Sequence, residues 1–370
     1  MNDKAAAVAV VAAATDVIVI GWILARGNGR IGAIRLAQAA VGGTALVFAQ
    51  TLGGYFAVGN PFLLMTILWA YLAIALPIVA FALFARASLR ARTTRSTRSL
   101  AAIALASVPV TLYASFVEPY RLITERTEVP IVEQRAPSRP LTVAVLADIQ
   151  CVEVTAREHE AVRRAMEVKP DLVLLPGDFV QVGSHRVPEI AEAFRALLAP
   201  LHAPLGVFCI QGDTDTRSDI EQLVRGTRVR FLDDQVVTLE RDGLRVTLAG
   251  IGIRYESVSA LAALRDAESR PGDDDIRIVL AHRPDVVFGL ARDSRIDLVV
   301  AGHTHGGQIA LPFYGPPFIS SNVPREVGWG GLHEIGGRRI YVSRGIGWEH
   351  GSAPRLRFLS PPEVSILTLR

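Results

Sequence analysis

The chain has 370 residues and a formal net charge of +3, and half of its residues are hydrophobic while only 20% are charged. A mean hydropathy of +0.32 is too high for an ordinary soluble enzyme, so we expect the excess of apolar residues to lie in membrane segments. The only two cysteines, Cys151 and Cys209, exclude a disulfide scaffold and a cysteine zinc site. We expect both to be small buried apolar residues.

Four apolar stretches occupy the first part of the chain: residues 5–25, 36–58, 61–85 and 100–117. Each is close to the roughly 20 residues that an α-helix needs to cross a bilayer. We therefore predict that residues 1–118 form a transmembrane region of about four helices, in contact with membrane lipids. A cleaved signal peptide is the alternative interpretation of the first stretch, although Asp16 interrupts its apolar core.

Arginines in the connections between these stretches predict the orientation of the chain. The connection before the second stretch carries three arginines and the connection before the fourth carries five, whereas the one around Gly59 and Asn60 carries none. The positive-inside rule places both arginine-rich connections in the cytoplasm. With four spans, everything after Val117 then lies outside the cytoplasm. We therefore predict a multi-pass protein of the cell membrane with an extracytoplasmic C-terminal domain.

The remainder of the chain is predicted to be a linker and one α/β domain. Residues 119–140 are charged and contain prolines, as linkers do, and the domain covers residues 141–370. Continuous apolar runs are typical of strands that are buried on both faces, and here such runs alternate with helical segments. The predicted strands are 141–147, 171–175, 206–210, 246–249, 276–281, 297–301, 339–342 and 363–369, and the predicted helices are 155–168 and 188–198.

Potential metal ligands follow five of the predicted strands. Because the carboxyl ends of parallel strands meet at one edge of a sheet, we expect these side chains to lie together. Carboxylates and imidazoles suit divalent Mn, Fe, Zn or Co. Two such ions about 3.5–4 Å apart can clamp a phosphoryl group and generate a metal-bound hydroxide. The segments are LADIQ at 146–150, PGD at 176–178, QGDTD at 211–215, AH at 281–282 and AGHTHGGQ at 301–308.

This ordered set of motifs resembles the calcineurin-like metallophosphoesterase superfamily. The runs AGHTHGGQIALPFYGPP, YVSRGIGW and PRLRFLSPPEV are similar to its bacterial membrane-associated branch, the YkuE- and YaeI-like phosphoesterases. The resemblance covers about residues 141–370. It implies a four-layer α/β/β/α sandwich with a binuclear metal site, and an activity as a phosphatase or phosphodiesterase.

The resemblance also implies roles for individual residues, and two divalent ions (Mn, Zn, Fe or Co) as cofactors. Asp178, Asp213, Thr214 and Asp215 are the implied catalytic residues, with Asp215 orienting its loop rather than binding metal. One metal would be held by Asp148, Gln150, Asp178 and His305, and the other by Asp178, Asp213, His282 and His303, with Asp178 bridging the two.

Three positions depart from the usual motifs of the family. Gln150 replaces a histidine and is a weaker ligand, which predicts a weaker first site or a preference for a harder ion. Asp213 replaces an asparagine and adds a negative charge. Thr214 replaces the histidine that contacts the phosphate, and a threonine is no general acid at neutral pH. Either another group assists the leaving group or the leaving group is a good one. Nearby candidates for such a group are His159, His185, Arg254 and Arg283.

We therefore expect a membrane-anchored, metal-dependent hydrolase of a phosphate ester at the outer face of the membrane. The anchor favours a lipid-linked phosphate or pyrophosphate as its substrate. The apolar segment 311–323 either meets lipid or packs on its own domain. The alternative, motivated by Gln150 and Thr214, is a catalytically degenerate module that binds metal or phospholipid. No nucleic-acid partner is expected, and no glycine-rich phosphate loop followed by Lys and Ser/Thr is present.

Overall fold

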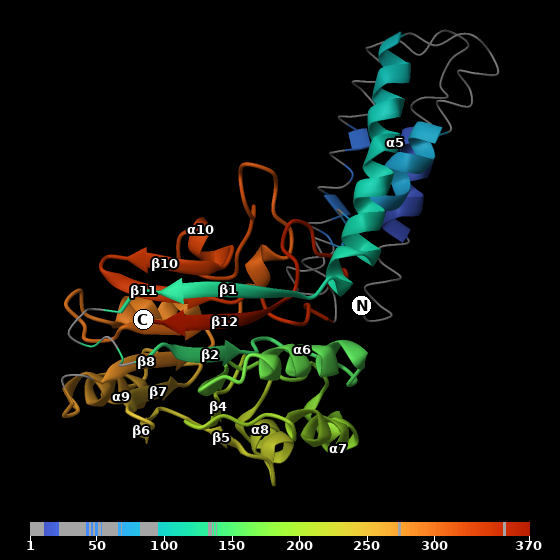
Figure 1. Ribbon diagram of the computed structural model, residues 1–370. Helices are drawn as coiled ribbons and strands as arrows, with labels where there is room; N and C mark the ends of the chain where they lie inside the picture. Colours follow the sequence, from blue (N-terminus) through green and yellow to red (C-terminus); the bar gives the residue numbers. More distant parts are fainter. Residues whose placement is uncertain are drawn as a thin grey trace. The chain divides into compact units, whose positions relative to one another are not determined.

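A computed structural model provides the fold (Figure 1). It describes residues 95–131, 135, 137, 139–272, 275–350 and 353–370, together with short stretches between residues 11 and 81. The chain divides into two compact units. Unit 1 contains residues 1–117 and 349–356, and unit 2 contains residues 118–348 and 357–370.

Within unit 1, the described residues of the range 1–117 are almost all helical. Its longest helix, α5 (Arg95–Phe116), continues through Pro109, and a short π-helix, η1, covers Tyr71–Ala75. The indole Nε1 of Trp69 donates a hydrogen bond of 3.2 Å to Ser115 Oγ, which joins α5 to the segment around η1. This contact links two of the predicted membrane stretches.

The predicted transmembrane region is not found in the described part of the chain, where no helix is both long and apolar enough to cross a membrane. The first three predicted stretches, 5–25, 36–58 and 61–85, lie wholly or partly outside the described residues. The fourth, 100–117, falls on α5. The anchor therefore stays a prediction.

Unit 2 is built on two mixed six-stranded sheets. In the first sheet the order is β1-β12-β2-β3-β4-β5, and β2 to β5 run parallel. In the second the order is β10-β11-β9-β8-β7-β6, with β7, β8, β9 and β11 parallel. The strands are β1 (Ile123–Val129), β2 (Leu141–Val145), β3 (Leu172–Leu175), β4 (Val207–Cys209), β5 (Val229–Phe231), β6 (Gln235–Arg241), β7 (Leu244–Ile251), β8 (Ile276–Ala281), β9 (Leu298–Ala301), β10 (Gly331–Ile335), β11 (Arg338–Val342) and β12 (Glu363–Leu369).

The two sheets pack face to face, with helices on both outer faces. Side chains alternate between the faces of a strand: Val143 and Val145 of β2 lie in the apolar cluster between the sheets, whereas Ala144 lies among residues of the outer helices. The predicted four-layer α/β/β/α arrangement is thus observed in unit 2. Helices α6 (Ala156–Glu167), α7 (Val187–Leu198) and α8 (Arg217–Val224) cover the first sheet, and α9 (Val258–Ser269) covers the second.

The predicted linker, 119–140, contains a strand. Within it, β1 pairs in parallel with β12 along seven residues of each strand, and η2 (Glu118–Tyr120) precedes it. This strand was not predicted, because charged residues interrupt the apolar residues in the sequence of β1, ITERTEV. At the first sheet's edge, where β1 lies, only one flank of a strand is paired, so polar side chains are tolerated there.

Most strands that the sequence predicted are present within a few residues, and both cysteines are buried as expected. The predicted helix 155–168 is α6, which Thr155 and Glu158 begin with a reciprocal capping box. Helices α8 and α9 and strands β5, β6 and β10 were not predicted. They are amphipathic or short, and their exposed faces carry many charged residues.

A buried arginine fixes the end of helix α9. Arg277, on β8, is completely buried, and its guanidinium donates to the carbonyl oxygens of Ala267, Arg270 and Gly272. Backbone carbonyls at the end of a helix have no partner within the helix, so Arg277 satisfies groups that would otherwise be buried without a hydrogen bond.

We expect Arg277→Met to lower the free energy of unfolding by about 2–4 kcal/mol, because it removes the donor of one buried and two half-buried carbonyls. Arg241→Met is the matched control, because Arg241 is exposed and its ion pair with Asp242, at 3.6 Å, is loose. It should change stability by less than about 0.5 kcal/mol. Urea unfolding of the two full-length variants measures the difference, and equal destabilisation would contradict this role.

Candidate metal centre

The residues that follow β2, β3, β4, β8 and β9 come together at one edge of the two sheets. In each sheet these strands are parallel, so their carboxyl ends face the same way. Three carboxylates come from the first sheet and three imidazoles from the second. The side chains are those of Asp148, Asp178, Asp213, His282, His303 and His305.

These six side chains form two groups of three. In each group, the candidate ligand atoms all lie within 4.8 Å of one another. One group contains Asp213, His282 and His303, and the other contains Asp148, Asp178 and His305. Of the seven metal ligands that the resemblance implied, six are therefore brought together. The seventh, Gln150, is buried in the loop of Asp148, and its backbone N–H donates to the Asp178 carbonyl oxygen at 2.8 Å.

Contacts within the first group are short. Asp213 Oδ2 lies 2.9 Å from His303 Nδ1 and 3.4 Å from His282 Nε2, and the two ring nitrogens are 3.2 Å apart. Asp178 Oδ2 lies 3.5 Å from His282 Nε2 and so connects the two groups. Carboxylate and imidazole donors converging in this way fit a borderline divalent cation.

Hydrogen bonds on the far side of two imidazoles select the nitrogen that faces the group. His282 Nδ1 is 2.8 Å from the Pro176 carbonyl oxygen, and His303 Nε2 is 2.7 Å from the Ser320 carbonyl oxygen. A carbonyl only accepts, so each of these nitrogens carries a proton. When the rings are neutral, as a metal ligand must be, the opposite nitrogens therefore carry the lone pairs that can bind a cation.

The backbone around the centre is strained and closely packed. Asp148, Asp178 and His303 have positive φ values of 47°, 54° and 72°, a conformation that is uncommon for residues other than glycine and that clusters at functional sites. A Cβ on Gly302 would lie 2.4 Å from Asp148 Oδ2, and one on Gly212 would lie 2.0 Å from Asp178 Oδ1. Glycine at both positions therefore lets the two carboxylates approach the backbone.

Asp215 and Thr214 support Asp178 rather than joining either ligand group. Asp215 accepts hydrogen bonds from the backbone N–H groups of Phe179 (2.8 Å) and Val180 (3.1 Å), which fits the loop-orienting role inferred from the sequence. The Thr214 backbone N–H donates to Asp178 Oδ1 at 2.8 Å. The Thr214 hydroxyl is buried and has no hydrogen-bond partner among the described residues.

Arg283 is the one of the four possible helper residues that lies at the centre. Its guanidinium donates to both carboxylate oxygens of Asp213, at 2.6 and 3.1 Å. His159, His185 and Arg254 are exposed, and none of them belongs to either ligand group.

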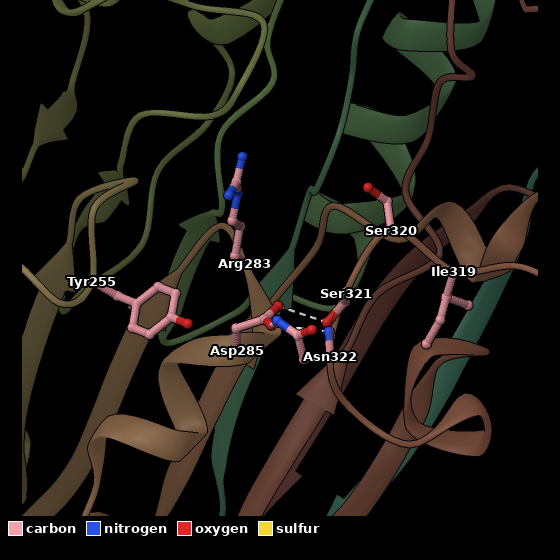
Figure 2. Close-up of a pocket in the computed structure, with 7 residues that line it drawn as sticks. All are labelled: Tyr255, Arg283, Asp285, Ile319, Ser320, Ser321 and Asn322. Atoms are coloured by element: carbon pink, nitrogen blue, oxygen red, sulfur yellow. Dashed lines mark hydrogen bonds between the residues drawn. The ribbon is translucent and has the colours of Figure 1, made fainter. Parts of the chain in front are cut away.

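A polar cavity of about 350 Å³ adjoins Arg283 (Figure 2). In its lining, Asp285 accepts hydrogen bonds from Ser321 and Asn322. The Arg283 side chain extends away from this hydrogen-bonded group, as Figure 2 shows. The lining residues are Tyr255, Arg283, Asp285, Ile319, Ser320, Ser321 and Asn322.

The titration of the centre reflects burial and crowded negative charge. Burial, with the charge of Asp178 adding to it, raises the pKa of Asp148 to about 7 and that of Asp215 to about 8. Burial alone would lower the pKa of His282, but Asp178 and the other neighbouring carboxylates outweigh it and raise that pKa to about 10. Burial opposes ionisation of Asp213 too, yet hydrogen bonds from His282, His303 and Arg283 hold its pKa well below the usual range.

Sequence reasoning missed Arg357, which joins several segments around the metal centre by hydrogen bonds. This fully buried guanidinium donates to the carbonyl oxygens of His305, Arg344, Gly347 and Ser360, at 3.3, 2.8, 2.6 and 3.0 Å. The only sequence signal was its place in the run PRLRFLSPPEV, which carried the family resemblance without indicating a role for the arginine.

Comparison with known proteins identifies the family. The profile of the calcineurin-like phosphoesterase family matches residues 141–307. The metallophosphoesterase YkuE of Bacillus subtilis is 34% identical over 212 residues, which are 55% of this chain and 69% of YkuE. The phosphodiesterase YaeI of Escherichia coli is 30% identical over 238 residues, 62% of this chain and 82% of YaeI. The chain belongs to the calcineurin-like phosphoesterase family.

A third relative of this calcineurin-like phosphoesterase is similar over a longer part of the chain. The UDP-2,3-diacylglucosamine pyrophosphatase LpxG of Chlamydia trachomatis is 25% identical over 335 residues, 73% of this chain and 96% of LpxG. The relatives are named as a phosphodiesterase and a pyrophosphatase, and the family consists of phosphoester hydrolases. The chain is accordingly an enzyme that hydrolyses phosphate esters, and its ligand groups suit the divalent metals that the family uses.

Without metal, we expect the calcineurin-like phosphoesterase to become less stable as the pH rises from about 4 to about 10. Asp148, Asp215 and His282 hold their protons more tightly in the folded protein than in the unfolded chain, because their pKa values are raised to about 7, 8 and 10. The resulting stability is complete at low pH and is lost as the pH passes these values, by about 1.4 kcal/mol per pH unit for each proton.

Thermal unfolding of the EDTA-treated full chain at pH 5, 7 and 9 measures this effect. Mn²⁺ at saturating concentration should remove most of the loss, because the cation replaces the protons in balancing the carboxylates. A metal-free unfolding temperature that increases from pH 5 to pH 9 would contradict the charge arrangement described above.

Proposed function

We propose that this enzyme hydrolyses its phosphate ester at a centre of two divalent cations, one in each ligand group. The observation that carries the proposal is the pairing of two three-ligand groups, linked by Asp178 Oδ2 at 3.5 Å from His282 Nε2. Asp148, Gln150, Asp178 and His305 would hold one cation, and Asp178, Asp213, His282 and His303 the other. Bound cations supply positive charge that polarises a phosphoryl group and activates water.

Neighbouring residues fix the positions of the ligands Asp178 and Asp213 by hydrogen bonds. Asp215 and the Thr214 backbone fix the Asp178 loop through the hydrogen bonds described above. Arg283 holds Asp213 by two hydrogen bonds, which keep that carboxylate ionised and aimed at His303. A fixed ligand geometry of this kind reduces the reorganisation that the reaction requires.

The leaving group that we propose is a weak base, such as a phosphate. Neither a histidine nor a carboxylic acid occupies position 214, and the threonine there is no proton donor at neutral pH. A group that departs as a stable anion requires no such donor. The name of LpxG, a pyrophosphatase of a diacylated nucleotide sugar, supports a substrate of this kind. We accordingly propose a lipid-linked diphosphate, whose leaving group is a phosphate, as the substrate.

Metal-dependent hydrolysis is tested on the full chain, purified in detergent and stripped of metal with EDTA. We expect Mn, Zn, Fe or Co to restore hydrolysis of bis(p-nitrophenyl) phosphate. Asp178→Asn and His303→Ala should each lower the rate at least about 100-fold, because losing a ligand costs at least as much as losing its supporting hydrogen bond. The matched control is His185→Ala, which removes an exposed histidine and should keep the rate within about twofold.

No hydrolysis with any of these metals would sink the proposal. Should calorimetry still show metal binding that Asp178→Asn abolishes, the chain would be the binding module that Gln150 and Thr214 first suggested. Metal binding that survives both ligand variants would instead contradict the assignment of the ligands themselves.

We infer also that residues 1–118 anchor the enzyme in the membrane with its catalytic domain outside the cytoplasm. The apolar stretches and the two arginine-rich connections support this orientation. The similarity to LpxG, over 335 residues, is longer than residues 141–370 alone.

Membrane anchoring predicts that alkaline carbonate leaves the full chain in the membrane pellet of bacterial cells that express it. It also predicts that protease added to spheroplasts digests the catalytic domain, while a cytoplasmic marker enzyme stays intact as the control. Release of the chain by carbonate would refute the anchor, and protection of the domain from protease would refute its orientation.

A further inference from the structure

A long uncharged segment begins directly after the metal ligand His305. From Gly306 to Pro324 the chain has no Asp, Glu, Lys, Arg or His residue. Its middle part, residues 311–318, is called the apolar loop here. Phe313 has 110% of its reference area exposed, so water surrounds the whole ring. Large apolar side chains exposed together usually mark an interaction surface. The exposed large side chains of the loop are Leu311, Phe313, Tyr314 and Phe318.

The tip of the apolar loop has a defined backbone shape. Leu311 and Gly315 exchange two backbone hydrogen bonds, of 2.9 and 3.0 Å, and enclose a three-residue turn. Phe313, in this turn, has a φ of 64°, a costly conformation for a bulky residue. The turn therefore presents an aromatic side chain to the surroundings at an energetic cost, as expected of a functional contact.

The base of the apolar loop is fixed to the metal centre. Gly307 lies two residues after His305, and a Cβ on it would be 2.4 Å from Pro316 Cβ and 2.7 Å from the Phe318 carbonyl oxygen. Beyond the loop, Ser320 accepts the hydrogen bond of His303 at 2.7 Å. Ile319 and Ser320 also line the polar cavity beside Arg283 (Figure 2). A surface that binds the apolar loop would therefore also hold the metal centre close to that surface.

The shape and chemistry of the apolar loop fit a lipid surface. Its aromatic tip is a convex turn, so a partner would have to close around it, as fluid lipid does. Aromatic rings are enriched at the level of the lipid head groups. The exposed Arg325 guanidinium lies 4.0 Å from the centre of the Tyr314 ring, which places a positive charge beside the turn. That charge complements anionic lipid head groups.

We propose that the apolar loop inserts into the outer leaflet of an anionic lipid bilayer and thereby holds the metal centre at the head-group level. Insertion would help catalysis only if the substrate is lipid-linked, as proposed above. The insertion itself does not rest on that proposal. The two parts are measured separately.

Insertion is tested with a tryptophan at the tip. The full-length Phe313→Trp variant is reconstituted in phosphatidylcholine–phosphatidylglycerol vesicles with brominated acyl chains, which quench tryptophan fluorescence on contact. The signal of the four native tryptophans is subtracted by using the wild-type chain. We expect the fluorescence of the added tryptophan to fall at least about twofold, because an inserted ring reaches the acyl boundary.

The control for insertion is Arg241→Trp. Arg241 ends β6 beside the start of β7, and β7 runs parallel to β8 and β9, so Arg241 lies at the sheet edge opposite the metal centre. Its tryptophan should not be quenched. An unquenched tryptophan at 313 overturns the proposal. A second result would also overturn it: in the absence of lipid, the emission of the tryptophan at position 313 shifts to the blue as the protein concentration rises. A second copy of the chain would then cover the loop.

The catalytic consequence is tested with two substrates that share one leaving group. Methyl p-nitrophenyl phosphate is soluble, and hexadecyl p-nitrophenyl phosphate is embedded in the vesicles. Phe313→Asp should lower the ratio of the vesicle rate to the soluble rate at least about tenfold, because a carboxylate is costly in the interface. Arg241→Asp should leave this ratio unchanged.

The outcomes separate the two proposals. A wild-type chain that hydrolyses neither ester refutes the proposed function, while the quenching at 313 still decides insertion. A Phe313→Asp variant that keeps the wild-type ratio overturns the role of the loop in catalysis, even where the soluble ester is hydrolysed normally.

Discussion

Repulsion between buried carboxylates is the constraint on which the metal centre depends. Asp148 and Asp178 are almost completely buried at the ends of neighbouring strands, where water cannot screen their charges. The charge of Asp178 contributes to the raised pKa values of both Asp148 and Asp215. Such an arrangement is stable only when positive charge is supplied, by protons or by cations. The strained backbone and the close-fitting glycines hold the carboxylates where this charge is required.

Two departures from the family motifs become intelligible in terms of charge. Asp213 stands where the family usually has a neutral asparagine, and the extra negative charge is balanced by the two hydrogen bonds of Arg283. Since Arg283 follows directly on His282, one segment after β8 carries both a ligand and the balancing cation. Gln150 removes an imidazole but leaves an oxygen donor, so we expect the group of Asp148, Asp178 and His305 to prefer harder cations.

The sequence predicted the centre better than it predicted the fold around it. Asp148, Asp178 and His303 were found because ligands repeat at the ends of apolar strands, and this pattern survives in the sequence. Strand β1 was missed because Glu125, Arg126 and Glu128 resemble a linker. Arg357 was missed because its role depends on the carbonyl oxygens of four other residues, and backbone oxygens leave no trace in the side-chain sequence.

The position of β12 in the first sheet affects how the domain folds during synthesis. This strand lies between β1 and β2 and pairs with both, yet Ile123 and its partner Glu363 are separated by 240 positions. A ribosome adds about 5–20 residues per second, so β1 must wait roughly 10–50 s for β12, the one described strand that pairs with it. During that time β1 and one side of β2 are unpaired edges, which are prone to associate with other chains. The nascent enzyme is therefore exposed to aggregation at its first sheet, and the charged residues of β1 offer protection in that interval.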